Sequence, residues 1–307
     1  MPTAPLFEVA LAHPEPSQLG ESPLWSADEQ CLYHVDIPGH ELRRLDPASG
    51  ALQRWPLPAE PGCIALIDGD ARGLLVAGRD GLSRFDTSSG ALTPLVPPPF
   101  DPGRQRFNDG KPDAAGRLWV GTIDDARAPD AALYRYDARG GVRVAEGITT
   151  SNGLGWSPDG RTLYWTDTKA HEIYALDFDL SSGAVSNRRV FASFAQREAG
   201  APLETYGGRP DGAAVDVEGC YWVAMYEGQR LLRLAPDGRV LRELRLPVRC
   251  PTMPTFGGPD MRTLFVTTAR KGRPIEELDA QAWAGCVLCV EVDVPGLPPD
   301  RVHLPVA

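Results

Sequence analysis

The sequence lacks an excess of positive charge, and this excludes several classes of protein. Its 307 residues include 31 lysines and arginines against 41 aspartates and glutamates, so the formal net charge is −10. No cluster of basic residues offsets this balance. Nucleic acids and anionic membrane surfaces attract cationic proteins, so an acidic chain of this kind matches neither. We therefore expect no nucleic acid and no membrane as a partner.

Long apolar runs and a cysteine framework are missing as well. No window approaches the roughly 18 consecutive apolar residues of a membrane-spanning helix. Residues 1–6 have neither the basic nor the apolar region of a signal peptide. The six cysteines are scattered along the chain and do not have the pattern of a disulfide scaffold. These absences favour a cytoplasmic protein with reduced thiols.

Sustained helical periodicity is also absent, and the sequence contains a repeat instead. Short runs rich in β-branched and aromatic residues alternate with turns rich in Gly, Asp and Pro, which is typical of short strands. Each unit continues with a third and a fourth run, and four short antiparallel strands make one blade of a β-propeller. Clear examples of the first two runs of a unit are residues 111–122, 153–166 and 213–225.

Alignment of the units puts one residue of each in register. These residues are Glu21, Cys63, Asn108, Asn152, Asp211 and Thr252. Their spacings are 42, 45, 44, 59 and 41 residues, and all but one agree with the roughly 40–50 residues of known propeller repeats. The sequence therefore predicts an all-β fold, a six-bladed β-propeller with four antiparallel strands per blade, in one domain spanning residues 1–307. Either residues 6–11 or residues 301–306 complete the last blade.

The aligned residues are expected to open the innermost strand of each blade and to line the central channel. Loops between the second and third strands, and loops between blades, then lie at the same mouth. All three long insertions fall in such loops, at residues 123–131, 193–209 and 269–284. Because loops on a rigid scaffold commonly carry function, this mouth is the predicted ligand site.

Oxygen-bearing side chains dominate the predicted ring. An Asp or Asn at a strand start can cap a turn, but a channel-facing Glu21 has no turn to cap. Four such residues, Glu21, Asn108, Asn152 and Asp211, are costly to bury together without a cation or a polar ligand. An all-oxygen set suits one hard divalent ion, Ca²⁺ first and Mg²⁺ or Mn²⁺ next, with Zn²⁺ and Fe²⁺ as further candidates. Such an ion polarises carbonyl groups and activates water.

Four motifs in this ring resemble the SMP-30/gluconolactonase/luciferin-regenerating family. They are residues 20–25 (GESPLW), 106–111 (RFNDGK), 151–154 (SNGL) and 209–212 (RPDG). The resemblance runs from about residue 19 to residue 292. It implies a metal-dependent hydrolase that opens a sugar lactone, an aldonolactone such as gluconolactone, to the aldonic acid.

The resemblance also implies roles for individual residues. Glu21, Asn152 and Asp211 would be the metal ligands, with Asp211 also the catalytic general base, while Arg106 and Asn108 would bind the substrate. Some family members place a substrate-binding Glu in the stretch that matches residues 121–126, and the matching residue here is Ala126. Asp125, or else Asp124, is the expected substitute, and the sugar itself stays open.

Other interpretations of the sequence stay open or carry less weight. The same metal site suits a phosphotriesterase-like hydrolase, and many propellers are non-catalytic binding scaffolds. Asp109 and Asp113 are expected to form turns, and the strand tryptophans to pack between blades. The expected partner is a small sugar lactone, and the expected assembly is a monomer or a weak homo-oligomer.

Overall fold

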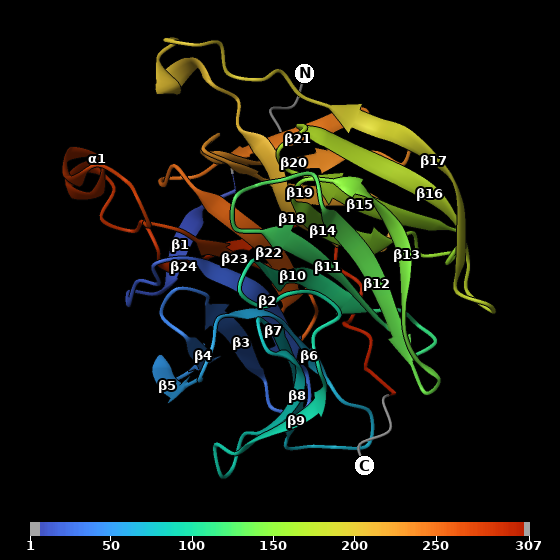
Figure 1. The fold of residues 1–307 in the computed structure, drawn as a ribbon. Helices are drawn as coiled ribbons and strands as arrows, with labels where there is room; N and C mark the ends of the chain where they lie inside the picture. The colour runs from blue at the N-terminus through green and yellow to red at the C-terminus, as the bar shows by residue number, and fades with distance from the viewer. Residues whose placement is uncertain (1–6, 304–307) are drawn as a thin grey trace.

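The computed structural model describes residues 7–303, in which six four-stranded antiparallel sheets surround a central channel (Figure 1). In the first five sheets the strands follow the chain from the channel outward. The first blade contains β2 (Gly20–Ser26), β3 (Cys31–Asp36), β4 (Glu41–Asp46) and β5 (Ala51–Pro56). The second contains β6 (Pro61–Leu66), β7 (Gly73–Gly78), β8 (Gly81–Asp86) and β9 (Leu92–Val96).

The next three blades have the same order. The third contains β10 (Gln105–Pro112), β11 (Leu118–Asp124), β12 (Ala131–Asp137) and β13 (Gly140–Ile148). The fourth contains β14 (Ser151–Trp156), β15 (Thr162–Asp167), β16 (Glu172–Asp179) and β17 (Ala184–Ser193). The fifth contains β18 (Arg209–Val215), β19 (Tyr221–Tyr226), β20 (Arg230–Leu234) and β21 (Val240–Arg245). The predicted six-bladed propeller is confirmed.

The last blade joins the two ends of the described chain. It contains β22 (Pro251–Gly257), β23 (Thr263–Thr268) and β24 (Val287–Glu291), and its outermost strand is β1 (Val9–His13). β1, which overlaps the N-terminal candidate segment, therefore supplies the fourth strand. Residue 6 of that segment lies outside the described residues. In the C-terminal candidate, Val302 makes a single bridge to Ile67, and residues 304–306 lie outside the described part. The pairing of β1 with β24 closes the ring and covers a sheet edge.

Large aromatic side chains fill the space between neighbouring blades, as the sequence predicts. Trp119 packs against Leu154 and Leu163 of the next blade, and Trp222 packs against Phe256 of the blade that follows. Each indole N–H needs a partner when buried. Trp119 Nε1 donates to Asp113 Oδ2 at 2.7 Å, and Trp222 Nε1 donates to Asp216 Oδ2 at 2.9 Å.

Every innermost strand is irregular beside its aligned residue. The pairing register shifts between Glu21 and Leu24 in β2, between Phe107 and Gly110 in β10 and between Asn152 and Gly155 in β14. Shifts at corresponding places occur in β6, β18 and β22. Such bulges redirect side chains and are common beside active sites. They free the ring residues from the strict alternation of a regular strand.

Glycine is required at one of these bulges. Gly153 follows Asn152 and has a φ of 58°, a left-handed conformation that side chains disfavour. A Cβ atom at this position would lie 2.3 Å from the hydroxyl of Tyr221 and 2.4 Å from that of Thr166. The motif glycine thus lets the inner strand turn beside the channel.

Short helices occur in two of the predicted insertions. The 3₁₀ helix η1 (Leu203–Thr205) lies between the fourth and fifth blades, and α1 (Ile275–Ala280) lies between β23 and β24. In Figure 1 the segment that carries α1 projects from the ring. Across residues 7–303, no helix has the length and apolar character needed to cross a membrane.

We predict that Asp216→Ala lowers the free energy of unfolding by roughly 3–5 kcal/mol, the usual cost of removing one partner of a buried ion pair. The Asp216 side chain is fully buried, accepts from Trp222 and pairs with Arg233 at 2.8 Å. Denaturant unfolding measures the loss. Asp237→Ala is the control, because Asp237 is 63% exposed beside Arg239, and such pairs contribute at most about 1 kcal/mol. Equal losses in the two variants would contradict the assignment.

Candidate active site

Four of the six aligned residues line one cavity of about 480 Å³ at the mouth where the long loops gather. They are Glu21 on β2, Asn108 on β10, Asn152 on β14 and Asp211 on β18. The other two aligned residues, Cys63 and Thr252, are buried and are not part of the lining. The structure therefore brings together the oxygen-bearing members of the predicted ring, from four different blades.

A chain of hydrogen bonds orders these side chains. Arg106 Nη1 donates to Asn108 Oδ1 at 2.8 Å, and Asn108 Nδ2 donates to Asn152 Oδ1 at 2.7 Å. Asn152 Nδ2 in turn donates to Asp211 Oδ1 at 2.6 Å and to Thr168 Oγ1 at 2.7 Å. Arg106, Asn108, Asn152 and Asp211 are all less than 9% exposed. The network fixes each carboxamide and leaves Asp211 Oδ2 free for another partner.

The two carboxylates of the ring are in an unfavourable electrostatic environment. Burial raises the pKa of Glu21 well above its ordinary value, and the charges of Asp211 and Asp109 raise it further, against the opposing effect of Arg106. Burial likewise raises the pKa of Asp211 to about 7; Asp109 adds to the shift and Arg209 opposes it. Carboxylates placed close together away from water favour a bound proton or a cation.

Asp109 is a third buried carboxylate near this site, and the turn predicted for it is wrong. It lies within β10, where its Oδ2 accepts from the backbone N–H of Leu154 at 3.0 Å. Its Oδ1 is buried and has no hydrogen-bond partner among the residues that the structure describes. The bulge in β10 was not visible in the sequence, and so the inward placement of Asp109 was missed.

The residues present fit a hard divalent cation. Glu21 and Asp211 supply carboxylate oxygens and Asn152 a carboxamide oxygen, the donor types that such ions prefer. Asn152 Oδ1 accepts from Asn108 Nδ2 at 2.7 Å, and the second lone pair of this carboxamide oxygen is available to a cation. Within residues 7–303 no three His, Cys, Asp or Glu side chains gather closely enough to hold a metal ion by themselves. The carboxamide is therefore an essential part of the set.

The residues predicted to bind substrate separate into two groups. Arg106 and Asn108 line the cavity. Asp125 is not in the lining, and its two oxygens accept from Arg79 at 3.0 and 3.1 Å. Asp124 accepts from the backbone N–H of Ala126 at 2.8 Å and from Arg104 at 3.1 Å. The charged residue that residues 123–131 contribute to the cavity is Arg127, beside Ile123.

Loop residues that no sequence motif indicates complete the mouth. Among them are Arg127, Lys169, His171, Arg197 and Tyr206. His171 Nε2 and the Tyr206 hydroxyl lie 2.5 Å apart and join two loops. The long insertions were the available signal for these residues, but insertions indicate only which mouth is built up and not which side chains enter it.

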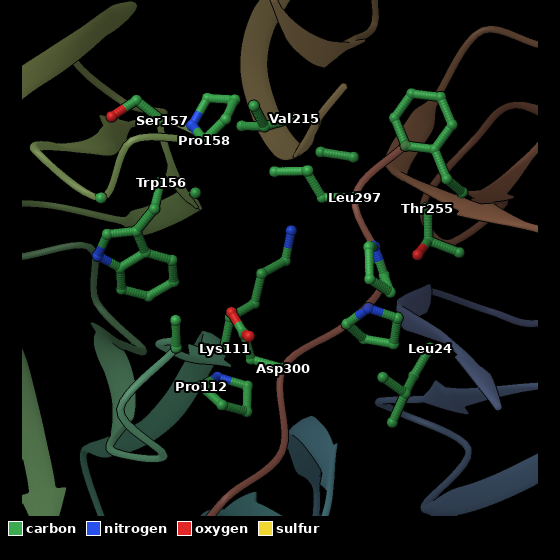
Figure 2. Close-up of a pocket in the computed structure, with 18 of the residues that line it drawn as sticks. Leu24, Lys111, Pro112, Trp156, Ser157, Pro158, Val215, Thr255, Leu297 and Asp300 are labelled. Atoms are coloured by element: carbon green, nitrogen blue, oxygen red, sulfur yellow. The ribbon is translucent and has the colours of Figure 1, made fainter. Parts of the chain in front are cut away.

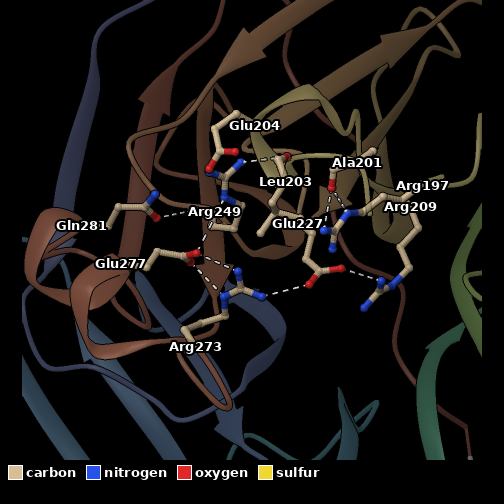
Figure 3. Close-up of polar contacts among 10 residues, drawn as sticks. All are labelled: Arg197, Ala201, Leu203, Glu204, Arg209, Glu227, Arg249, Arg273, Glu277 and Gln281. Carbon is tan, nitrogen blue, oxygen red and sulfur yellow. Dashed lines mark hydrogen bonds and ion pairs between the residues drawn. The ribbon is translucent and has the colours of Figure 1, made fainter. Parts of the chain in front are cut away.

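A series of ion pairs connects segments at the same mouth (Figure 3). Arg209, which lines the cavity, donates to Glu227 Oε2 at 2.6 Å, and Glu227 Oε1 accepts from Arg273 at 2.9 Å. Arg273 makes two further hydrogen bonds to Glu277 of α1, at 2.7 and 2.8 Å. Because these side chains are mostly buried, the series couples the projecting helix to the wall of the site.

A second cavity, of about 390 Å³, lies toward the C-terminal ends of the inner strands. Most of its lining is apolar, including Trp156, Val215 and Leu297, and Lys111 points into it (Figure 2). The amino group of Lys111 donates to the carbonyl oxygen of Ala213 at 2.5 Å. None of the four oxygen-bearing ring residues lines this cavity, so we assign the candidate active site to the opposite mouth.

Comparisons with known proteins cover almost the whole chain. Residues 19–270 match the family model described as the SMP-30/Gluconolactonase/LRE-like region. The chain is 42% identical over 284 residues to 6-deoxy-6-sulfogluconolactonase from Pseudomonas putida, which covers 92% of this chain and 94% of the relative. It is 34% identical over 291 residues to regucalcin from Danio rerio, with 93% and 95% covered. The crystal structure of a calcium-binding regucalcin from Agrobacterium tumefaciens matches with a TM-score of 0.90 and 27% identity, over 97% of this chain and 98% of that chain.

We predict that, in chelator-treated protein, Asp211→Asn raises the melting temperature relative to wild type by an amount that grows between about pH 4 and about pH 7. The folded protein holds the proton of Asp211 up to about pH 7, whereas an unperturbed aspartate loses it near 3.8. Ionisation in that window therefore destabilises only the wild type. Thermal unfolding at several pH values measures the difference. A difference that does not change with pH would contradict the prediction.

Proposed function

Because this chain belongs to the SMP-30/Gluconolactonase/LRE-like family, we propose that it is a divalent-metal-dependent hydrolase that opens a sugar lactone to the aldonic acid. The observation that carries the proposal is the pair of carboxylates, buried Asp211 and half-buried Glu21, in one cavity with Arg106 and Asn108. A relative named for lactone hydrolysis, at 42% identity, supports the same reaction. The substrate is a small sugar lactone, an aldonolactone of the gluconolactone type.

Glu21, Asn152 and Asp211 are the residues that would hold the cation. When bound there, a divalent ion supplies Lewis acidity toward the lactone carbonyl and lowers the pKa of a nearby water. Asn108 positions this set, because it donates to Asn152 and Asn152 donates to Asp211. The chain of hydrogen bonds thus links the residues for substrate to the residues for the cation.

Asp211 is the residue placed to move the proton. Its Oδ1 is held by Asn152, which leaves Oδ2 to accept a proton from the attacking water. The water oxygen bonds to the carbonyl carbon, and the bond from that carbon to the ring oxygen breaks. The ring oxygen takes up a proton and becomes a hydroxyl group, and the new carboxylic acid then ionises. One proton is released for each lactone opened.

Arg106 supplies the donors on the other side of the cavity, and Asn108 holds it there. Asn108 Nδ2 is not a free donor, because it already donates to the carbonyl oxygen of Ser151 and to Asn152 Oδ1. Arg106 Nη1 is anchored by Asn108 and by the carbonyl oxygen of Phe107, at 2.8 and 2.9 Å. Burial lowers the pKa of Arg106 to about 10, so the guanidinium keeps its positive charge at neutral pH. A fixed cation of this kind stabilises the negative charge that develops on the carbonyl oxygen.

We predict that Asp211→Ala abolishes both binding of divalent cations and turnover while the circular dichroism spectrum stays that of the wild type. Asn108→Ala should still bind the cation but lose roughly 10²–10³-fold in kcat, the usual cost of losing one oxyanion donor, because Arg106 loses the anchor that Asn108 Oδ1 provides. Calorimetric titration with Ca²⁺, Mg²⁺ and Mn²⁺ measures binding, and proton release from gluconolactone measures turnover. Asp237→Ala, on an exposed turn, is the control for both assays.

Each result bears on a different part of the proposal. Full lactone hydrolysis by Asp211→Ala would overturn the assignment of the base and of the cation site together. Loss of cation binding in Asn108→Ala would instead show that Asn108 is needed for the cation site and not for substrate alone. Wild-type turnover that survives exhaustive chelation would remove the metal from the mechanism.

A further inference from the structure

The rim of the active-site cavity carries cations that no carboxylate neutralises. Arg127, Lys169 and Arg197 all line the cavity, and each comes from a different loop of the mouth. None of them lies within 4.0 Å of an Asp or Glu side chain of residues 7–303. Arg209, on the same wall, is paired with Glu227 at 2.6 Å. In a chain with a net charge of −10, three unpaired cations at one mouth are a marked local reversal of charge.

One of these cations is held in place without losing its charge. Arg197 Nε and Nη2 both donate to the carbonyl oxygen of Ala201, at 2.9 and 2.7 Å. Within residues 7–303 this leaves the Nη1 edge of the guanidinium without a partner. The loop that carries Arg197 is itself fastened by the contact of Tyr206 with His171. A positioned guanidinium with a free edge is suited to a tetrahedral oxyanion.

The charge of Arg127 reaches the catalytic groups. It lowers the pKa of Asp211, against the larger effect of burial, and it adds to the lowering of the pKa of Arg106 that burial causes. Arg127 therefore lies within electrostatic reach of both side chains. A substrate whose carbonyl lies beside Arg106 would extend its far end toward this rim.

The two carboxylates that this loop was expected to offer a neutral sugar are already paired. Asp125 is paired with Arg79 and Asp124 with Arg104, so neither carboxylate is free to accept from a hydroxyl group. Ala126 occupies the position between these carboxylates and Arg127. A neutral hydroxymethyl group at the rim would therefore find no free carboxylate on Asp124 or Asp125, whereas an anionic group would meet three complementary charges.

We propose that Arg127, Lys169 and Arg197 select sugar lactones that carry a sulfonate or phosphate group on the carbon farthest from the lactone carbonyl. This inference rests on the lactone hydrolase function proposed above. It adds a substrate class and three specificity-determining residues to that function. Sulfonate and phosphate share the tetrahedral oxyanion that these cations recognise, and the experiment distinguishes between them.

The test compares three lactones on metal-supplemented wild-type protein. They are gluconolactone, 6-phosphogluconolactone and 6-deoxy-6-sulfogluconolactone, each assayed by proton release at several salt concentrations. We expect kcat/KM to be at least tenfold higher for one or both anionic lactones, and this preference should shrink as salt rises because exposed charges are screened. The better of the two anionic lactones identifies the group that the rim accepts.

Single variants then locate the preference. Arg127→Ala, Lys169→Ala and Arg197→Ala should each reduce the ratio of anionic to neutral kcat/KM by roughly tenfold, the effect of about 1.4 kcal/mol, mainly through KM. Arg139→Ala is the matched control, because Arg139 is exposed, lies on the turn between β12 and β13 and is outside the cavity. That control should leave the ratio unchanged.

The outcomes separate the two proposals. No hydrolysis of any lactone by the metal-loaded protein would overturn the proposed function. Equal kcat/KM for neutral and anionic lactones, or ratios that none of the three rim variants changes, would overturn this inference and leave the lactone hydrolase standing. A neutral lactone that is clearly preferred would likewise overturn it.

Discussion

The placement of two like charges in one cavity is the constraint on which the rest of the site depends. Glu21 and Asp211 lie on the first and fifth blades and are far apart in sequence. Asp211 is buried and Glu21 is half-buried. Only a closed ring holds such residues against their mutual repulsion. The pairing of β1 with β24 supplies that closure, so the strand most distant from the channel helps to keep the carboxylates together. A cation between them would turn this unfavourable arrangement into a favourable one.

The rigid blades and the variable loops contribute different parts of the site. The inner strands place the carboxylates and carboxamides, and a bulge beside each aligned residue directs it. The loops differ from blade to blade and build the mouth. The pairs from Arg209 through Glu227 and Arg273 to Glu277 connect α1 to the cavity wall. The depth of the site is thus determined by the scaffold, and its entrance by segments that can change without disturbing the scaffold.

Most of the fold could be predicted from the repeat in the sequence. Runs and turns at a nearly constant period predicted the blades, and their alignment predicted four of the polar residues that line the cavity, Glu21, Asn108, Asn152 and Asp211. Contacts between segments that are far apart in the sequence could not be predicted from it. Asp125 is paired with Arg79, 46 residues away, and no local pattern indicates such a partner. Asp109 was assigned to a turn because a bulge that breaks strand alternation has no signature in a single sequence. The choice of β1 as the closing strand depended on packing alone.

Charge is distributed unevenly between the depth of this cavity and its rim. Glu21, Asp211 and nearby Asp109 make the deep end negative, while Arg127, Lys169 and Arg197 make the entrance positive. With a doubly charged ion at the deep end, the negative charge there is largely cancelled and the cations dominate the field of the whole cavity. Since a low-dielectric channel focuses that field, an anionic ligand would be drawn inward although the protein as a whole is acidic. Binding of a cation at the deep end would therefore determine how strongly the entrance attracts an anionic substrate.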